Sequence, residues 1–260
     1  MIQERQAVNT LIERGAIFYV SHSGGKDSQA MYAILSCIVP ADQIVVVHAD
    51  LGKVEWHGVQ DHIRNTIRHD LNVVQAGKSF FDMVRHRAAT RQDVPAWPSS
   101  STRQCTSDLK RDPIHKFIRQ DMKRRNADLA INCTGIRAEE STSRRNKVPL
   151  TVNKRLSKAG REVWEYMPIH HWTERHVFRG IARAGQQPFW AYKRNNRLSC
   201  VFCIMGSEND LQHGAEQRPD LYAEYQAVEA ETGWTMFNGQ SLKDRVEGSK
   251  SRQPSLPRAA

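Results

Sequence analysis

The chain has 260 residues, of which 39% are hydrophobic and 25% charged, a composition typical of a globular protein with one sizeable core. No apolar run approaches the roughly 20 residues that cross a bilayer, and the first residues lack the apolar stretch of a signal peptide. We therefore expect a cytoplasmic protein that does not enter a membrane. Five cysteines in such a protein favour metal, cluster or thiol chemistry over structural disulfides.

The formal net charge of +10 is concentrated in one part of the chain. Residues 1–100 hold ten basic and ten acidic side chains and residues 162–260 hold twelve of each, whereas residues 101–161 hold 16 basic against 6 acidic side chains. Such a block predicts an anionic ligand or partner. The charge alone leaves two alternatives open: a phosphate pocket, or a surface for nucleic acid or another polyanion.

The hydrophobic pattern predicts strands that alternate with helices. An apolar strand at 16–20 runs into a glycine-rich turn and an apolar-periodic helix through 30–38. Further along we predict strands at 44–47, 73–74 and 129–132, and helices at 55–69, 173–184 and 219–231. This alternation predicts an α/β fold in which a parallel, Rossmann-type sheet carries helices on both faces, followed by a smaller, mostly helical C-terminal region.

We expect three parts: an α/β domain over 1–165, a helical region with a Cys-X-X-Cys pair over 166–247, and a disordered tail over 248–260 whose composition forms no core. In a parallel sheet, ligands lie beyond the carboxyl ends of the strands. Ser23, Asp50 and Gly135 each follow a predicted strand. The sequence therefore predicts that these three positions belong to one site.

The hexapeptide Ser23-Gly24-Gly25-Lys26-Asp27-Ser28 is the strongest chemical signal. Its two glycines let consecutive backbone N–H groups turn toward an anion. Lys26 adds a positive charge, and the helix that begins near Asp27 directs its positive end to the same point. The spacing differs from a Walker A loop, which needs four residues between its first Gly and Gly-Lys-Ser/Thr. A plain glycine-rich turn is the simpler alternative, and the added lysine and serines disfavour it.

The hexapeptide resembles the PP-loop of the ATP pyrophosphatase superfamily, whose members cut ATP between the α and β phosphates. Further motifs are similar to the phosphoadenosine phosphosulfate (PAPS) reductase branch, and their order and spacing make them jointly specific. They run through residues 16–205 as His48-Ala49-Asp50-Leu51-Gly52, Arg103-Gln104-Cys105-Thr106 with Leu109-Lys110 and Pro113, Gly135-Ile136-Arg137 with Glu140-Ser141 and Arg144, Pro168-Ile169 with Trp172, and Pro188, Tyr192, Arg197 and Cys200-Val201-Phe202-Cys203. The resemblance implies an adenine nucleotide as substrate, either ATP or PAPS or adenylyl sulfate (APS).

Site roles follow from these matches. Residues 23–28, Asp50 and Gly135 are the predicted nucleotide-binding positions, and the predicted catalytic residues are Lys26, Asp50, Lys110, Arg137 and Arg144. Asp50 would bind a nucleotide hydroxyl or help to hold Mg²⁺. Arg137 and Arg144 carry guanidinium groups that suit bidentate recognition of phosphate or sulfate, and their spacing of seven puts them on one face if the stretch is helical. Each of these side chains also has a simpler interpretation as a solvated charge.

Three cysteines are predicted metal ligands. Cys200 and Cys203 have the spacing that brings two thiolates onto one metal or cluster. The resemblance adds Cys105, because cluster-bearing family members place a Cys pair there, although Gln104 takes the place of one member of that pair here. The alternatives are a [4Fe–4S] cluster with an open iron, a cluster completed by Cys133, a zinc ion, or a vestigial site.

Three functions are compatible with the sequence. The first is cleavage or transfer at the α-phosphate of ATP, with adenylation of an acceptor for sulfur transfer as one form of it. The alternative is reduction of PAPS or APS with an external thiol, because no cysteine follows Cys203 to attack the sulfonyl sulfur. The third is an accessory module of a mobile element or defence system, in which nucleotide occupancy switches binding to nucleic acid or a protein complex. A homo-oligomer is compatible with all three.

Overall fold

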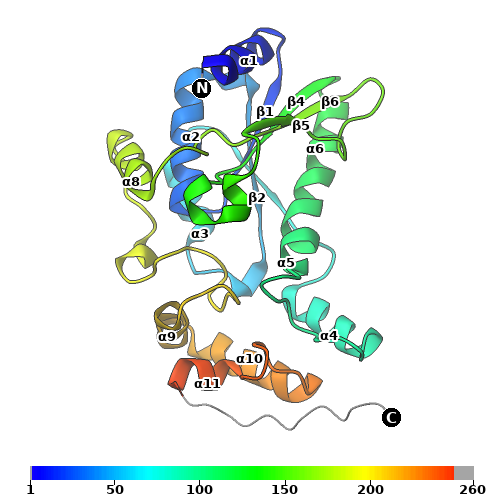
Figure 1. Cartoon of the computed structure of the whole chain (residues 1–260), viewed down its shortest axis with the longest axis vertical. Coiled ribbons are helices and arrows are strands. Elements are labelled where there is room, and N and C mark those ends of the chain that lie inside the picture. Colours follow the sequence, from blue (N-terminus) through cyan, green and yellow to red (C-terminus); the bar gives the residue numbers. More distant parts are fainter. Residues whose placement is uncertain (1, 249–260) are drawn as a thin grey trace. The chain divides into compact units, whose positions relative to one another are not determined.

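The computed structural model describes residues 2–248, which form two compact units (Figure 1). Of these, residues 2–50, 57–75 and 110–190 form unit 1, and residues 51–56, 76–109 and 191–248 form unit 2. The expected boundary at residue 165 differs from this partition, because the stretch 166–190 belongs to unit 1 and three separate stretches build unit 2. The predicted tail, 248–260, lies outside the described residues except for Gly248.

Unit 1 contains a six-stranded sheet with the order β3-β2-β1-β4-β6-β5. All neighbouring strands are parallel except the edge strand β5, which runs antiparallel to β6. The strands are β1 (Ile17–Ser21), β2 (Ile44–Ala49), β3 (Leu71–Val74), β4 (Leu129–Cys133), β5 (Leu150–Val152) and β6 (Glu162–Tyr166). The four predicted strands correspond to β1–β4, and β5 and β6 are additional.

Helices cover both faces of this sheet because successive strand side chains point to opposite sides. Phe18 and Val20 of β1 join a core with residues of α1, α2 and α8, whereas Tyr19 between them joins a second core with residues of α6. The helices of unit 1 are α1 (Ile2–Glu13), α2 (Lys26–Ile38), α3 (Val59–Thr66), α6 (Asp112–Arg124), α7 (Thr142–Arg145) and α8 (Glu174–Arg183), with 3₁₀ turns at Ala41–Gln43 and Ala138–Glu140. The predicted α/β fold, with a mostly parallel sheet between helices, is confirmed.

Unit 2 is mostly helical and has an aromatic core. Its helices are α4 (Phe80–Thr90), α5 (Gln104–Thr106), α9 (Glu208–Gln217), α10 (Pro219–Thr232) and α11 (Leu242–Glu247). Tyr225 of α10 is fully buried, stacks on Trp97 and makes edge contacts with Phe81 and Phe202. A 3₁₀ turn at Gly52–Val54, a π-helical segment at Ser107–Arg111 and a 3₁₀ turn at Trp190–Lys193 complete the described elements. Across residues 2–248, no helix combines the length and apolar character needed to cross a membrane.

Candidate functional site

The predicted phosphate loop lies between β1 and α2, at the carboxyl edge of the sheet in unit 1. Gly24 has φ of +75°, a left-handed conformation that glycine adopts without strain. Gly25 is extended and serves as the N-cap of α2, and no side chain caps that end of the helix. The first N–H groups of a helix have no partner within the helix. This end of α2 therefore presents donors and a positive dipole end to an anion.

The loop is held in shape by its own serines. The Ser23 N–H donates to Oγ of Ser28 at 3.1 Å, and Oγ of Ser28 donates to the Gly25 carbonyl at 2.9 Å. Ser28 is buried, whereas Ser23 is exposed. Oγ of Ser23 also lies 3.2 Å from Oγ of Ser28. We infer that Ser28 fixes the loop and that the exposed Ser23 hydroxyl is the one that a ligand can reach.

His22, which was not among the predicted site residues, also fixes the loop. Its Nδ1 accepts the Gly24 N–H at 3.1 Å, and its carbonyl is 2.9 Å from Nδ1 of His48, which therefore donates to it. Since Nδ1 of His22 is an acceptor, the proton of the neutral ring is on Nε2, which is buried with no hydrogen-bond partner among the described atoms. The sequence feature that could have pointed to His22 is its position directly before the hexapeptide.

The buried His22 ring makes stability depend on pH. Burial, with smaller contributions from His48 and His62, lowers the pKa of His22 to about 3. Below about pH 6.5 the His22 ring binds a proton in the unfolded chain but stays neutral in the folded chain. The stability that the neutral ring contributes is therefore complete above pH 6.5 and is lost as the pH falls toward 3. We expect urea unfolding to show a free energy that declines from pH 6.5 to 4, by at most about 1.4 kcal/mol per pH unit for this group. His22→Gln, which keeps a neutral acceptor, should decline less steeply. Equal slopes for the two proteins would contradict this assignment.

Lys26 is buried in an ion-pair network. It is 5% exposed, and its Nζ lies 3.3 Å from Oε1 of Glu174 and 3.8 Å from Oδ2 of Asp27. Glu174 opens α8, and α8 packs against α2, so this helix pair encloses the lysine stem. Glu174 lies eight residues after the end of β6, and its approach to Lys26 is a tertiary feature that no local pattern predicts.

Arg137 extends the same network. It is 4% exposed, and its Nε donates to Oδ1 of Asp27 at 2.6 Å, while one of its terminal nitrogens bonds to Glu139. Glu139 in turn accepts the backbone N–H of Glu174 at 2.8 Å. The hydrogen bond from that N–H, and then the one from Arg137, lower the pKa of Glu139 below its usual value. Two predicted cationic residues thus converge on the phosphate loop, and carboxylates neutralise both of them.

Gly135 meets the loop through its backbone. A Cβ built at this position would lie 2.9 Å from the carbonyl carbon of Asp27 and 3.0 Å from the backbone nitrogen of Ser28. Such distances are too short for non-bonded atoms. The segment after β4 therefore packs directly on the first turn of α2, and only glycine allows this approach without a shift.

The remaining predicted site residues also belong to unit 1. Asp50 follows β2 and accepts a hydrogen bond from Nε2 of Gln75 at 2.6 Å. Arg144 lies in α7 and pairs with Glu140. Arg137 and Arg144 do not share one helix face as suggested, because Arg137 precedes a 3₁₀ turn and α7 begins anew at Thr142. Lys110 is half-buried in the π-helical segment before α6.

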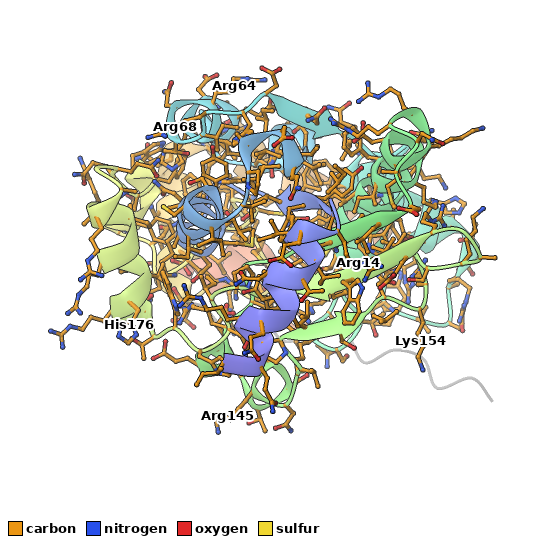
Figure 2. All side chains as sticks on the ribbon, turned by 90° about the horizontal axis from the view of Figure 1, so that it is seen from above. Arg14, Arg64, Arg68, Arg145, Lys154 and His176 are labelled. Carbon is orange, nitrogen blue, oxygen red and sulfur yellow. The ribbon has the colours of Figure 1, made fainter. Side chains whose placement is uncertain are left out.

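Part of the positive charge in 101–161 is paired within the protein. Arg124 and Arg125 both bind Asp121, which is buried and accepts the Tyr19 hydroxyl at 2.9 Å, and Arg155 lies 3.3 Å from Asp112. Figure 2 shows that Arg145 and Lys154, two further basic residues of this block, lie at different places on unit 1. The excess charge is therefore not one uniform face of unit 1.

A row of exposed basic side chains on one face of α6 provides a test of the predicted polyanion contact. Lys116, Arg119 and Lys123 are exposed at spacings of three and four, so they share one helix face. If this face binds nucleic acid, K116E/R119E/K123E should weaken binding of single-stranded DNA or RNA about tenfold or more, and lower the salt slope by about one for each lost phosphate contact. Salt titrations by fluorescence anisotropy would measure both. Undetectable binding by the unsubstituted protein would end this prediction.

The three predicted metal ligands all lie in unit 2. Cys105, Cys200 and Cys203 are each half-buried. The pKa of the fully buried Tyr225 is raised, first by burial and then by the charge interaction with these three cysteines. Their sulfurs are not all within 4.8 Å of one another. Thiolates on one tetrahedral zinc would be roughly 3.8 Å apart for Zn–S bonds of about 2.3 Å. Cys105, Cys200 and Cys203 therefore stay the predicted ligands of either a cluster or a zinc ion. Cys133, by contrast, is fully buried in the core of unit 1.

We predict that anaerobically purified protein is brown, with broad absorption near about 400 nm that bleaches in air. Each of C105S, C200S and C203S should lower the iron and sulfide content, because three thiols leave no spare ligand. Cys37 provides the control: it is exposed on α2, and C37S should leave the iron content unchanged. Protein with neither iron nor zinc by elemental analysis would rule out the metal site.

Two comparisons with known proteins gave matches. The family model described as phosphoadenosine phosphosulfate reductase domain matches residues 17–196. A crystal structure of phosphoadenylyl-sulfate (PAPS) reductase from Candida auris, in complex with phosphate, is similar with a TM-score of 0.44 and 12% sequence identity, over 70% of this chain and 80% of that chain. No curated protein gave a match. Because the family model covers well over half of the sequence, the chain belongs to the phosphoadenosine phosphosulfate reductase domain family, within the PP-loop ATP pyrophosphatase superfamily.

Proposed function

We propose that unit 1 binds an adenine nucleotide by its phosphates at the start of α2, and that the reaction is thiol-dependent reduction of PAPS or APS. One observation carries the proposal: a glycine-rich loop and an uncapped helix start lie beside two buried cations, Lys26 and Arg137. The family match supports a sulfonucleotide as the substrate.

An incoming anion can take the place of part of the ion-pair network around the loop. The carboxylates that neutralise the two cations belong to Glu174 and Glu139, whose side chains are 55% and 50% exposed. A phosphate or sulfate can replace these carboxylates while they turn into solvent. The phosphate or sulfate then accepts the charge-assisted hydrogen bonds that Lys26 and Arg137 previously donated to these carboxylates. Asp27 stays between Lys26 and Arg137 and keeps them in position.

The proposed reaction transfers the sulfonyl group and then two electrons. A thiolate attacks the sulfur, the bond from sulfur to the phosphate oxygen breaks, and the adenosine phosphate leaves. A second thiolate attacks the thiol-derived sulfur of the resulting S-sulfonate, which forms a disulfide and releases sulfite. Two thiols are oxidised and sulfur(VI) becomes sulfur(IV). We propose that an external dithiol supplies both thiols, and that Lys26 and Arg137 stabilise the charge on the departing phosphate.

Cleavage of ATP between its α and β phosphates is the second candidate, favoured by the complete Ser-Gly-Gly-Lys-Asp-Ser loop. Mg²⁺ prefers oxygen ligands, and Asp50 together with the nucleotide phosphates would hold it. Asp27 fits that role poorly, because cations already face both of its carboxylate oxygens. In this reaction the ion would neutralise the β,γ-pyrophosphate.

One set of incubations separates the two candidates. The protein is supplied with PAPS, APS or ATP, each with and without a dithiol, and sulfite, adenosine phosphates and pyrophosphate are measured. We expect sulfite from PAPS or APS only when the dithiol is present. AMP and pyrophosphate from ATP, without sulfite from either sulfonucleotide, would instead establish the second candidate. No turnover of any of the three nucleotides would reject both.

A further inference from the structure

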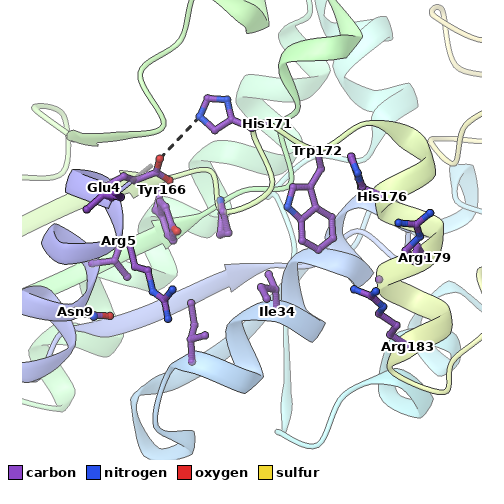
Figure 3. Close-up of a pocket in the computed structure, with 15 residues that line it drawn as sticks. Glu4, Arg5, Asn9, Ile34, Tyr166, His171, Trp172, His176, Arg179 and Arg183 are labelled. Atoms are coloured by element: carbon purple, nitrogen blue, oxygen red, sulfur yellow. Dashed lines mark ion pairs between the residues drawn. The ribbon is translucent and has the colours of Figure 1, made fainter.

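A groove of about 970 Å³ lies within unit 1, lined by α1, α2, α8 and the segment after β6 (Figure 3). Its lining from α2, Ile34 and Ile38, lies eight and twelve residues beyond Lys26. At 1.5 Å per residue, that is roughly 12–18 Å along the helix from the phosphate loop. No residue of the loop 23–28 lines the groove. It is therefore separate from the site proposed for the nucleotide.

The floor of the groove is apolar. Val8, Ile34, Pro168 and Trp172 line it, and Ile38 at its edge is 44% exposed. The Trp172 ring is in close contact with Gly180 of α8, where a Cβ would lie 2.8 Å from Cζ3 of the indole. The ring is thus fixed as a wall of the groove. An occupant must offer apolar side chains to cover this floor.

The rim of the groove is cationic. Figure 3 shows Arg179 and Arg183 on α8, and Arg5 on α1 at the other side. All three are exposed, and none forms an ion pair with any residue of the described chain. The acidic side chain at the rim, Glu4, faces His171 at 3.9 Å. The rim therefore has a surplus of guanidinium groups, which are suited to carboxylates.

We propose that this groove docks a short acidic amphipathic segment of a partner protein, in which apolar side chains at helical spacing cover the floor and neighbouring carboxylates pair with Arg5, Arg179 and Arg183. This is the helix-in-groove mode of recognition. A nucleic acid fits less well, because bases stack on exposed aromatic planes, whereas Tyr166 in the lining is buried and the exposed apolar residues, Ile2 and Ile38, are aliphatic. The chain's own residues 249–260 are also a poor match, since they carry three basic and no acidic side chains.

The test uses random 16-residue peptides displayed on phage, selected against the full chain. A 16-residue helix is about 24 Å long, enough to span several turns of α8. We expect enriched peptides to place Asp or Glu beside apolar residues spaced three and four apart. Their synthetic versions, measured by fluorescence anisotropy, should bind R179E/R183E about tenfold or more weakly than the unsubstituted protein.

R64E/R68E is the matched control, because Arg64 and Arg68 have the same spacing, are exposed, and do not line the groove. Peptide affinity should be unchanged in this variant, and nucleotide binding should be unchanged in both variants. The proposal is overturned if no peptides are enriched, or if the enriched peptides bind R179E/R183E as well as the unsubstituted protein. It is also overturned if single-stranded DNA, or a second copy in sedimentation velocity, is the species whose binding R179E/R183E abolishes.

Discussion

Replacing Lys26 with Met is expected to lower kcat/KM for the adenine nucleotide about 100-fold or more, equivalent to about 2.7 kcal/mol of transition-state stabilisation. Met keeps most of the buried stem, so the change removes the charge with little loss of packing. The free energy of unfolding should change by less than about 1 kcal/mol, because the lost pair with the half-exposed Glu174 is screened by solvent. Steady-state kinetics and urea titration measure the two quantities.

Glu174→Gln is the informative partner of this substitution. It leaves Lys26 in place and removes a carboxylate that an incoming phosphate must displace. We expect KM to fall or stay the same, with a similar unfolding free energy. Lys26→Ala is a weaker experiment, because it also opens a cavity beside α8. If Lys26→Met bound and turned over the nucleotide like the unsubstituted protein, the phosphate loop would not be the site.

The elements predicted best were those with a strong local signal. β1, β2 and β4 are apolar runs buried on both faces, and the hexapeptide between β1 and α2 forms the loop that its glycines and serines predict. β6 was missed because charged residues alternate with its aromatic ones, and α6 because most of its residues are polar. β6 has no apolar run, whereas α6 does have apolar residues at helical spacing, Ile114, Phe117, Ile118 and Met122, among its more numerous polar ones.

Features that depend on tertiary packing were beyond the sequence. The approach of Glu174 to Lys26 needs α8 to pack on α2, and the division into two units needs three distant stretches to assemble unit 2. The association of Cys105 with Cys200 and Cys203 in one unit was expected only through the family resemblance. For Cys200 and Cys203, the Cys-X-X-Cys spacing alone predicted that they lie together.

Replacing Gly135 with Ala is expected to impair both stability and nucleotide binding. The added Cβ would lie 2.9 Å from backbone of Asp27, and backbone cannot move aside as the end of a flexible side chain can. Either α2 or the segment after β4 must shift. Overpacking of this kind costs about 1–3 kcal/mol. Because the displaced atoms are the first turn of α2, we also expect nucleotide affinity to fall about tenfold or more, since such geometry determines how well backbone donors reach an anion.

Gly77→Ala is the matched control, because a Cβ there would meet nothing within 4 Å and, like Gly135, Gly77 does not have a positive φ. Its unfolding free energy should stay within about 0.5 kcal/mol of that of the unsubstituted protein. The two site substitutions then have different signatures: Lys26→Met reduces turnover with stability nearly unchanged, whereas Gly135→Ala reduces stability and affinity together. Calorimetric nucleotide titrations and urea unfolding of both variants measure these signatures. A Gly135→Ala protein with unchanged affinity would mean that the packing of this segment on α2 does not set the geometry of the loop.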